Sequence, residues 1–392
     1  MERNCCLETR MTPPDRLKIV NIVTQMEAGG AQSAAIRLAC ALRDRGHAVE
    51  TWFLYRKRPT FDGEAGVRVF APRRPRSLPG YLSLGIAVTA QLRRLRPDVV
   101  VTFTHYANVL GGAAAYLAGI RARIATHRSP AHAQPKLAQV LNCAFGIIGV
   151  YTANIAVSST VVESFARYPK RFRRTLTLIH NGVTLEPSTL TRDAARMHLR
   201  LPLGVPIIGT VGRLAAVKDH AVLIRALARL PGCYVAIAGD GELRPELDAL
   251  AASMGAAERV LFLGELSPND VRHFLRAIDV FAFCSKHEAF GFAAAEAALA
   301  QVPIVCTRIP AMVEIFGAPE GEERVLFFEV GDDAGLAARI QVLLDDPQLA
   351  RKLAKAARER AQFFSFDRMV EGYERLIIRA AAVGRTPNAR AV

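Results

Sequence analysis

Residues 17–24, LKIVNIVT, form a short apolar run rich in β-branched side chains, which is typical of a buried parallel strand. Gly29-Gly30 follows, and residues 31–45 then carry apolar side chains at helical spacing up to Gly46. A strand, a tight turn and a returning helix are the unit from which doubly wound parallel sheets are built. This stretch therefore predicts an α/β fold.

The same alternation of strand and helix continues outward from this stretch. In the first half, further strands are predicted at 48–54, 67–70, 98–103, 124–126, 155–157 and 176–179, and helices at 81–95, 106–118 and 135–150. Residues 180–192, HNGVTLEPSTLTR, break the pattern with turn formers, and it restarts at 206–211, PIIGTV. In the second half, strands are predicted at 206–211, 233–238, 260–263, 280–283, 304–306 and 325–328, and helices at 219–230, 242–253, 268–276, 292–300 and 333–345.

The chain of 392 residues is therefore predicted to contain two facing doubly wound, Rossmann-like domains. We expect an N-terminal tail at 1–16, a first domain at 17–190 and a second at 191–365. A C-terminal helix within 366–392 is expected to return to the first domain. In open α/β sheets, ligands bind beyond the carboxyl ends of the strands, so we expect the site in a cleft between the domains.

Composition excludes several classes of protein. The 51% hydrophobic content excludes a disordered chain, and seven scattered cysteines exclude a disulfide framework. The first twenty residues lack a secretory signal, and no apolar run is long enough to predict a membrane span. We therefore expect a soluble, cytoplasmic protein, in which 137–150 forms a buried or interfacial helix.

The positive charge is confined to one half of the chain. Residues 1–190 hold 26 Lys+Arg against 11 Asp+Glu, whereas residues 191–392 hold 25 of each, and the total is +15. A solvated surface, an anionic substrate, an anionic membrane and nucleic acid are the alternatives. Nucleic acid is disfavoured, because no aromatic residues interleave with the arginines and no nucleic-acid-binding motif is present.

The strongest local pattern is 286–296, KHEAFGFAAAE, between a predicted strand and a predicted helix. A glycine at the start of a helix lets a phosphate approach free backbone N–H groups, and the helix dipole favours its negative charge. Glu288 and Glu296 flank this turn and are able to accept hydrogen bonds from sugar hydroxyls. Two glutamates eight residues apart are also common on solvated helices, so this pattern alone leaves a purely structural role open.

A second pattern follows the first strand of the second domain. Arg213 and Lys218 stand in the loop after Gly212, at the sheet edge where the Glu288 loop is also expected. A guanidinium grips phosphate oxygens as a planar fork, and an ammonium adds a mobile charge. Gly239-Asp240-Gly241 is a further tight strand-to-helix turn, and Asp240 is expected to be a turn former. Neither this turn nor Gly29-Gly30 completes a dinucleotide fingerprint.

From residue 18 onward the chain resembles the family 4 retaining glycosyltransferases, which have the GT-B architecture of two facing doubly wound domains. The order of the motifs carries the resemblance. They are Gly29-Gly30-Ala31-Gln32, Val157-Ser158-Ser159, Asn181-Gly182-Val183, Gly212-Arg213-Leu214 with Lys218, Gly239-Asp240-Gly241, Phe262-Leu263-Gly264, Glu288 with Phe290-Gly291 and Glu296, and Phe364-Ser365-Phe366.

The resemblance implies roles for individual residues in binding a nucleotide-sugar donor. It implies that Arg213 and Lys218 neutralise the diphosphate and that Glu296 holds the ribose. Glu288 and His127 would serve as the catalytic residues that contact the donor sugar. The backbone N–H groups offered to the phosphates and sugar would be those of Phe290, Gly291 and Phe292, with Gly30 approaching from the first domain.

The resemblance also implies metal-independent transfer with retention, without cofactor or enzyme nucleophile, from a UDP-sugar in preference to a GDP-sugar. The first domain would bind the acceptor, a lipid-linked sugar or a polysaccharide or glycolipid intermediate. His105 and Arg128 are candidates on the acceptor side, and so is Asn108, although helix capping also explains Asn108. Residues 81–95 and 137–150 are the predicted contacts of a peripheral protein with the inner face of an anionic membrane. The alternatives are a nucleotide-sugar 2-epimerase of the same architecture and a non-catalytic nucleotide-sugar-binding protein.

Overall fold

A computed structural model describes residues 16–27 and 29–385, which form two compact units. Unit 1 comprises Met1–Ile179 with Val370–Val392, and unit 2 comprises His180–Met369. The predicted tail at 1–16 lies outside the described residues except for Arg16. Among residues 16–27 and 29–385, no helix combines the length and apolar character that crossing a bilayer requires.

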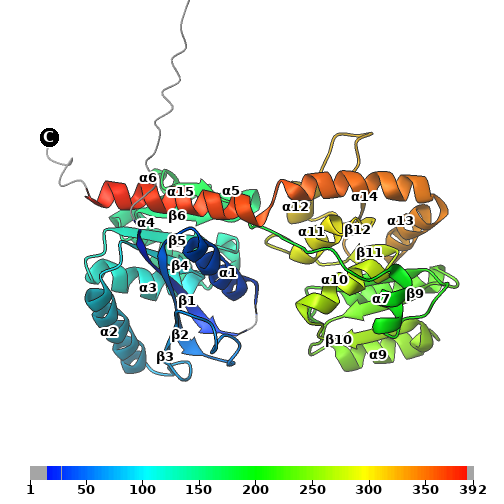
Figure 1. Cartoon of the computed structure of the whole chain (residues 1–392), viewed down its shortest axis with the longest axis horizontal. Coiled ribbons are helices and arrows are strands. Elements are labelled where there is room, and N and C mark those ends of the chain that lie inside the picture. The colour runs from blue at the N-terminus through cyan, green and yellow to red at the C-terminus, as the bar shows by residue number, and fades with distance from the viewer. Residues whose placement is uncertain (1–15, 28, 386–392) are drawn as a thin grey trace, which may run out of the picture. The chain divides into compact units, whose positions relative to one another are not determined.

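In the part of the chain that is described, unit 1 is built on a parallel sheet of seven strands (Figure 1). Side by side, these are β3 (Val67–Ala71), β2 (Ala48–Arg56), β1 (Lys18–Met26), β4 (Val99–Phe103), β5 (Ala122–His127), β6 (Ala153–Ala156) and β7 (Leu176–Leu178). Its helices are α1 (Gly30–Asp44), α2 (Leu78–Leu95), α3 (His105–Leu117), α4 (Lys136–Ile148), α5 (Ser159–Ser164), α6 (Lys170–Arg173) and, from Val370 onward, α15 (Phe366–Arg385).

Unit 2 repeats this plan with six parallel strands among the residues described. Side by side, these are β10 (Val260–Gly264), β9 (Tyr234–Ala238), β8 (Ile207–Val211), β11 (Val280–Phe283), β12 (Ile304–Thr307) and β13 (Leu326–Phe328). Its helices are α7 (Arg192–His198), α8 (His220–Ala226), α9 (Arg244–Ser253), α10 (Pro268–Ala277), α11 (Phe292–Leu299), α12 (Pro310–Phe316), α13 (Asp333–Asp345) and α14 (Pro347–Gln362).

The boundary between the units differs from the one predicted after residue 190. The turn-rich stretch that begins at His180 belongs to unit 2. There Val183 forms a bridge with Ser365, and its N–H donates to the Phe364 carbonyl over 2.8 Å. The sequence pattern breaks at residue 180, but it does not show to which domain the turn-rich stretch belongs. Only the long-range pairing with residues 364–365 assigns this stretch to unit 2.

Both sheets reverse their strand order next to their first strand. In unit 1 the reversal lies between β1 and β4, and in unit 2 between β8 and β11. Loops that leave the carboxyl ends of such a strand pair diverge to opposite faces of the sheet and leave a crevice for a ligand. The loop that carries Arg213 follows β8 and the loop that carries Glu288 follows β11, so the topology places both at the switch point of unit 2.

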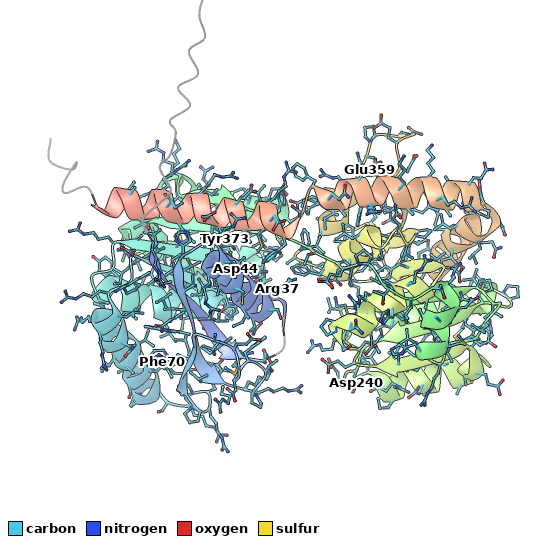
Figure 2. The ribbon with its side chains drawn as sticks, viewed as in Figure 1. Arg37, Asp44, Phe70, Asp240, Glu359 and Tyr373 are labelled. Carbon is cyan, nitrogen blue, oxygen red and sulfur yellow. The ribbon has the colours of Figure 1, made fainter. Side chains whose placement is uncertain are left out.

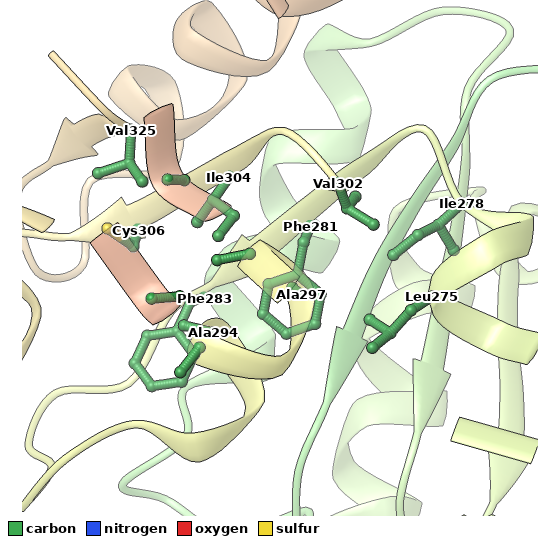
Figure 3. Packing of buried hydrophobic residues seen from close by; sticks show 14 of the residues in the cluster. Leu275, Ile278, Phe281, Phe283, Ala294, Ala297, Val302, Ile304, Cys306 and Val325 are labelled. Atoms are coloured by element: carbon green, nitrogen blue, oxygen red, sulfur yellow. The ribbon is translucent and has the colours of Figure 1, made fainter. Parts of the chain in front are cut away.

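Helix α11 is held on the sheet by close packing of small side chains (Figure 3). Phe281 and Phe283 of β11 and Ala294 and Ala297 of α11 are buried in one hydrophobic cluster. Burying each phenylalanine contributes about 1.5–3 kcal/mol, and the alanines let the helix approach the strand closely. The core therefore positions the N-terminus of α11 relative to the end of β11.

Candidate active site

The loops after β8 and β9 are joined by a backbone hydrogen bond and pack closely against each other through their backbones. The Gly212 N–H donates to the Ala238 carbonyl over 2.9 Å. A Cβ on Gly239 would lie 2.0 Å from the Gly212 carbonyl oxygen, and one on Gly241 would lie 2.5 Å from the Leu214 oxygen. Only glycine permits these approaches. The two glycines that flank Asp240, which Figure 2 labels, therefore hold the backbone that carries the phosphate-binding candidates.

Arg213 and Lys218 differ in their surroundings. The side chain of Arg213 is exposed, and no hydrogen bond or ion pair joins its guanidinium to another described residue. Lys218 is half-buried, forms an ion pair with Glu288, and places its Nζ 5.8 Å from the ring centroid of Phe283. The sequence predicted both as phosphate-binding residues. The structure brings Lys218 into contact with the Glu288 loop, whereas the Arg213 side chain forms no described hydrogen bond or ion pair with that loop.

Glu288 is fixed by the end of β11. Its Oε1 accepts hydrogen bonds from Lys218 Nζ and, over 3.1 Å, from Ser285 Oγ. The neighbouring Lys286 N–H donates to the Val217 carbonyl over 2.8 Å, which ties this loop to the loop after β8. The Lys218 and Glu288 side chains are only 24% and 19% exposed, so their mutual attraction is screened less than at an open surface.

The N-terminus of α11 begins at Gly291, whose φ of +92° lies in the left-handed region. A Cβ here would lie 2.2 Å from Met312 Cε. No side chain caps this helix end. Among the described residues, no backbone carbonyl accepts a hydrogen bond from the N–H of Phe290, Gly291 or Phe292. These amides and the helix dipole are suited to an anion.

The aromatic side chains beside Gly291 have a structural role. Phe290 is buried, and its ring centroid lies 5.1 Å from that of Phe292 and 5.7 Å from that of Phe364. This packing occupies the Phe290 ring, and the predicted donation of the Phe290 and Phe292 backbone amides to a ligand stays a prediction. Glu296 is half-buried one helical turn after Phe292, so both side chains lie on one face of α11.

His220, a residue that sequence analysis missed, supports the loop that carries Arg213. It is the first residue of α8, is buried, and places its Nε2 3.3 Å from the Arg213 carbonyl oxygen. Burial lowers the pKa of His220 to about 4, so the imidazole is neutral at pH 7 and donates this bond through Nε2–H. An isolated histidine at the start of a helix carries no pattern that would have identified this role.

In unit 1, Gly30 and His105 stand at the switch point between β1 and β4. Gly30 starts α1, which lacks a side-chain cap and acidic residues in its first turn. Just before His105, Thr104 has a φ of +102°, a strained value for a β-branched residue, and its hydroxyl lies 2.5 Å from that of Thr24. Asn108 is buried and accepts a hydrogen bond from Thr102 Oγ1 over 2.7 Å, so its side chain serves the fold.

His127 lies at the end of β5, inside unit 1, and is only 1% exposed. Its Nε2 is 2.9 Å from Asn154 Oδ1, and its ring packs against Phe165 and Phe172. Burial lowers the pKa of His127 to about 4, so its imidazole is neutral at pH 7. This packing gives His127 a clear structural role, and the predicted contact with a donor sugar stays a prediction.

Arg128 follows His127 and lies near Tyr373 of α15 and Arg37 of α1, which Figure 2 labels. Burial lowers the pKa of the Arg128 guanidinium. Tyr373 itself is buried, with its ring centroid 6.2 Å from that of Phe103. Arg128 therefore belongs to the contact between α15 and the sheet of unit 1, and nothing here places it on an acceptor.

Sequence models of two protein families match the chain. The model described as "Glycosyltransferase Family 4" matches residues 28–187, and the one described as "Glycosyl transferases group 1" matches residues 191–360. Together they cover most of both units. The chain belongs to the family 4 glycosyltransferases.

Curated relatives of this glycosyltransferase act in lipopolysaccharide core biosynthesis, according to their names. The chain is 28% identical to the glycosyltransferase LpsD of Rhizobium meliloti over 93% of this chain and 99% of that protein. It is 34% identical to LpsE of the same organism, over 46% of this chain and 52% of LpsE. A D-inositol 3-phosphate glycosyltransferase of Xylanimonas cellulosilytica is 28% identical over 92% of this chain and 94% of its own length.

Solved structures of similar fold are GT-B glycosyltransferases. HepE of Anabaena in complex with UDP and glucose superposes with a TM-score of 0.80 at 22% identity, over 92% of this glycosyltransferase and 99% of HepE. WaaG, which is involved in lipopolysaccharide biosynthesis, superposes with a TM-score of 0.71 at 18% identity, over 94% and 100% of the two chains. These likenesses confirm the predicted fold of two Rossmann-like units.

Proposed function

We propose that this glycosyltransferase moves a sugar from a nucleoside-diphosphate sugar, a UDP-sugar in preference to a GDP-sugar, and retains the anomeric configuration. The observation that carries the donor part is the meeting of Lys218, Glu288 and the uncapped start of α11 at the switch point of unit 2. UDP-bound HepE shares the fold and supports the choice of nucleotide.

In this proposal, the diphosphate takes the place of Glu288 as the partner of Lys218. Arg213, which is exposed, closes on the phosphate oxygens, and the amides of Phe290, Gly291 and Phe292 donate to them. Glu288, released from Lys218, accepts hydrogen bonds from the donor sugar, and Glu296 holds the ribose. Because cations and amides already face the leaving group, we propose that no divalent metal or cofactor is needed.

The chemistry is a same-face substitution. The bond between the anomeric carbon and the β-phosphate oxygen breaks, and negative charge develops on the leaving diphosphate. The acceptor hydroxyl forms the new bond to the same face of that carbon and gives its proton to the departing phosphate oxygen. Charge stabilisation at the leaving group is the main contribution of the protein. Each hydrogen-bond donor to a developing oxyanion typically contributes about 10²–10³-fold in rate. This step assigns no enzyme nucleophile.

For the acceptor, we propose a lipid-linked sugar of polysaccharide or glycolipid assembly. The names of LpsD, LpsE and WaaG support this class. Such an acceptor stands at a membrane, and we propose that unit 1 contacts the cytoplasmic face of an anionic bilayer.

An apolar stripe on α2 supports this membrane contact. Leu78, Leu82 and Ile86, spaced four residues apart, are 74%, 60% and 70% exposed, while Leu84 and Val88 face the core. On α4, the exposed apolar residues are Leu137, Val140 and Ile148. Exposed arginines precede α2 at Arg73, Arg74 and Arg76, and others stand in its last turn and at its end at Arg93, Arg94 and Arg96. Apolar side chains between basic ones are typical of an interfacial helix.

A panel of UDP-, GDP- and ADP-sugars tests the enzymatic part. We expect free nucleoside diphosphate to appear with at least one UDP-sugar. Its release would also argue against a non-catalytic binder. No release from any donor in the presence of an acceptor would reject the transferase, whereas conversion of the donor sugar to its 2-epimer would establish the epimerase alternative.

Sedimentation with vesicles tests the membrane part. We expect binding to phosphatidylglycerol-containing vesicles and little to pure phosphatidylcholine. Leu82→Ser with Ile86→Ser should abolish binding, while the control pair Met197→Ser with Leu203→Ser, also exposed apolar residues but of unit 2, should not. Equal, negligible binding to both vesicles would reject membrane contact and leave the transferase untouched.

A further inference from the structure

Four side chains from different elements lie near one another at the carboxyl edge of the sheet in unit 1. Tyr55 ends β2, Arg74 lies between β3 and α2, Tyr81 is in the first turns of α2, and Tyr106 is in the first turn of α3. The Tyr55 phenol interacts electrostatically with the other three. We call these four residues the tyrosine–arginine cluster.

The cluster presents hydrogen-bond donors to solvent. Arg74 Nε donates to Tyr81 Oη over 3.1 Å, and no further hydrogen bond or ion pair of Arg74 to another described residue occurs. Its two Nη groups, and the Tyr81 hydroxyl hydrogen, are then available to a ligand. A guanidinium held through Nε, with both Nη groups exposed, is arranged for bidentate binding of a phosphate or carboxylate.

The acidic residue beside the cluster is already neutralised. Glu27 accepts from Lys57 Nζ over 2.7 Å and from Gln25 Nε2. Gln25 Oε1 in turn accepts from Tyr55 over 3.0 Å. This network orients the Tyr55 phenol and gives the Glu27 carboxylate a cationic partner.

The cluster also offers an aromatic surface. Tyr106 is 37% exposed, and its ring centroid lies 4.3 Å from that of His105. Exposed aromatic rings next to polar groups are suited to the apolar faces of a sugar ring. The cluster stands on the loops at the same sheet edge as Gly30, where the topology of unit 1 leaves its ligand crevice.

Resting on the proposed transferase function, we infer that the tyrosine–arginine cluster binds the acceptor, and that the acceptor is a sugar bearing an anionic group. Arg74 and the Tyr81 hydroxyl bind the anionic group, and Tyr106 packs against the sugar ring. The positive charge of the first half of the chain then serves substrate selection as well as any membrane contact.

The test measures binding of simple sugars to the full chain saturated with UDP, by ligand-observed NMR. The probes are glucose, glucose 6-phosphate, glucose 1-phosphate and glucuronate. We expect at least one anionic probe to bind roughly tenfold or more tightly than glucose, as hydrogen bonds to charged groups allow. Arg74→Ala should remove this preference and Tyr81→Phe should weaken it several-fold. Tyr106→Ala should weaken all four probes.

Arg73→Ala is the matched control, because Arg73 is the exposed arginine next to Arg74 and has the same charge. We expect its affinities to stay within about twofold of the unmodified chain. The inference is wrong if no anionic probe binds more tightly than glucose, or if Arg73→Ala and Arg74→Ala behave alike. UDP affinity and donor hydrolysis, which report on unit 2, should be unchanged in all these variants, so a failure of the donor site is distinguishable.

Discussion

Lys218 and Glu288, 70 positions apart in the sequence, form an ion pair across the ends of two adjacent strands in unit 2. Lys218 stands in the loop after β8, and Glu288 in the loop after β11. This pair lies at a topological switch point, beside the free amides at the start of α11. It therefore holds the Lys218 ammonium where a diphosphate is expected to bind.

Removing Lys218 should harm donor binding in a way that depends on Glu288. Lys218→Ala leaves the Glu288 carboxylate facing an incoming phosphate, so we expect kcat to fall roughly 10²–10³-fold and UDP affinity to fall with it. In the double variant with Glu288→Ala, this repulsion is absent and UDP affinity should partly recover. Calorimetric titration with UDP checks both.

The control for Lys218 is Lys286→Ala, because Lys286 pairs with Asp219 over 3.2 Å in the same loops. It should keep nearly normal UDP affinity. If the double variant binds UDP no better than Lys218→Ala alone, Glu288 does not hold the lysine in place of the phosphate.

Arg213→Ala should separate activity from stability. The exposed guanidinium has no ion pair within the described residues, so its loss should change the free energy of unfolding by less than about 0.5 kcal/mol. Turnover should fall roughly 10²-fold, because a phosphate contact is lost. Urea unfolding and steady-state kinetics on the same preparation measure the two effects, and near-normal turnover would exclude Arg213 from the donor site.

Gly291→Ala should destabilise unit 2. A Cβ there meets Met312, and the left-handed φ strains any other residue, so we expect a loss of about 1–3 kcal/mol. Adding Met312→Ala should relieve the steric contact and leave the backbone strain, although it also removes packing. If the Gly291→Ala variant is as stable as the parent, the backbone at the start of α11 can shift to accept a side chain, and the packing against Met312 is not as tight as the structure indicates.

Two buried histidines should make stability depend on pH. The pKa values of His127 and His220 are lowered to about 4 by burial, whereas the unfolded chain titrates near 6.5. Between these values the unfolded chain binds more protons, so the free energy of unfolding should fall as pH drops from about 6.5 to about 4. Each histidine contributes at most about 3 kcal/mol to this fall.

Replacing one histidine isolates its share. His127→Asn retains a polar group beside Asn154 but does not titrate, so this variant should lose part of the slope between pH 6.5 and 4 in denaturant unfolding. An unchanged slope would mean that the pKa of His127 is the same in the folded and the unfolded chain.

Chelation tests the metal-independent mechanism. With Arg213, Lys218 and the α11 amides as counter-charges, we expect EDTA to leave the release of nucleoside diphosphate unchanged. Loss of turnover on chelation, restored by Mg²⁺ or Mn²⁺, would overturn this part of the proposal.

Sequence patterns predicted the helices and strands well where each is long enough to show a repeating spacing of apolar residues. The strands from β1 to β13 and the long helices appear where expected, to within a few residues. The short helices α5, α6, α7 and α12 were not predicted, because four to seven residues carry no periodicity. The positions of the candidate residues Arg213 and Glu288 at one sheet edge were predictable, because parallel strands bring their carboxyl ends to one edge.

The sequence by itself determined the α/β alternation, the two doubly wound units and the loops that carry the phosphate-binding candidates, because these follow from periodicity and from glycines at turns. Only the tertiary structure decided that Lys218 pairs with Glu288, that His127 packs against aromatic rings, and that Arg74, Tyr81 and Tyr106 lie near one another at one sheet edge. Such relationships depend on which strands become neighbours and on how side chains fill the space between them, and no local sequence pattern encodes either.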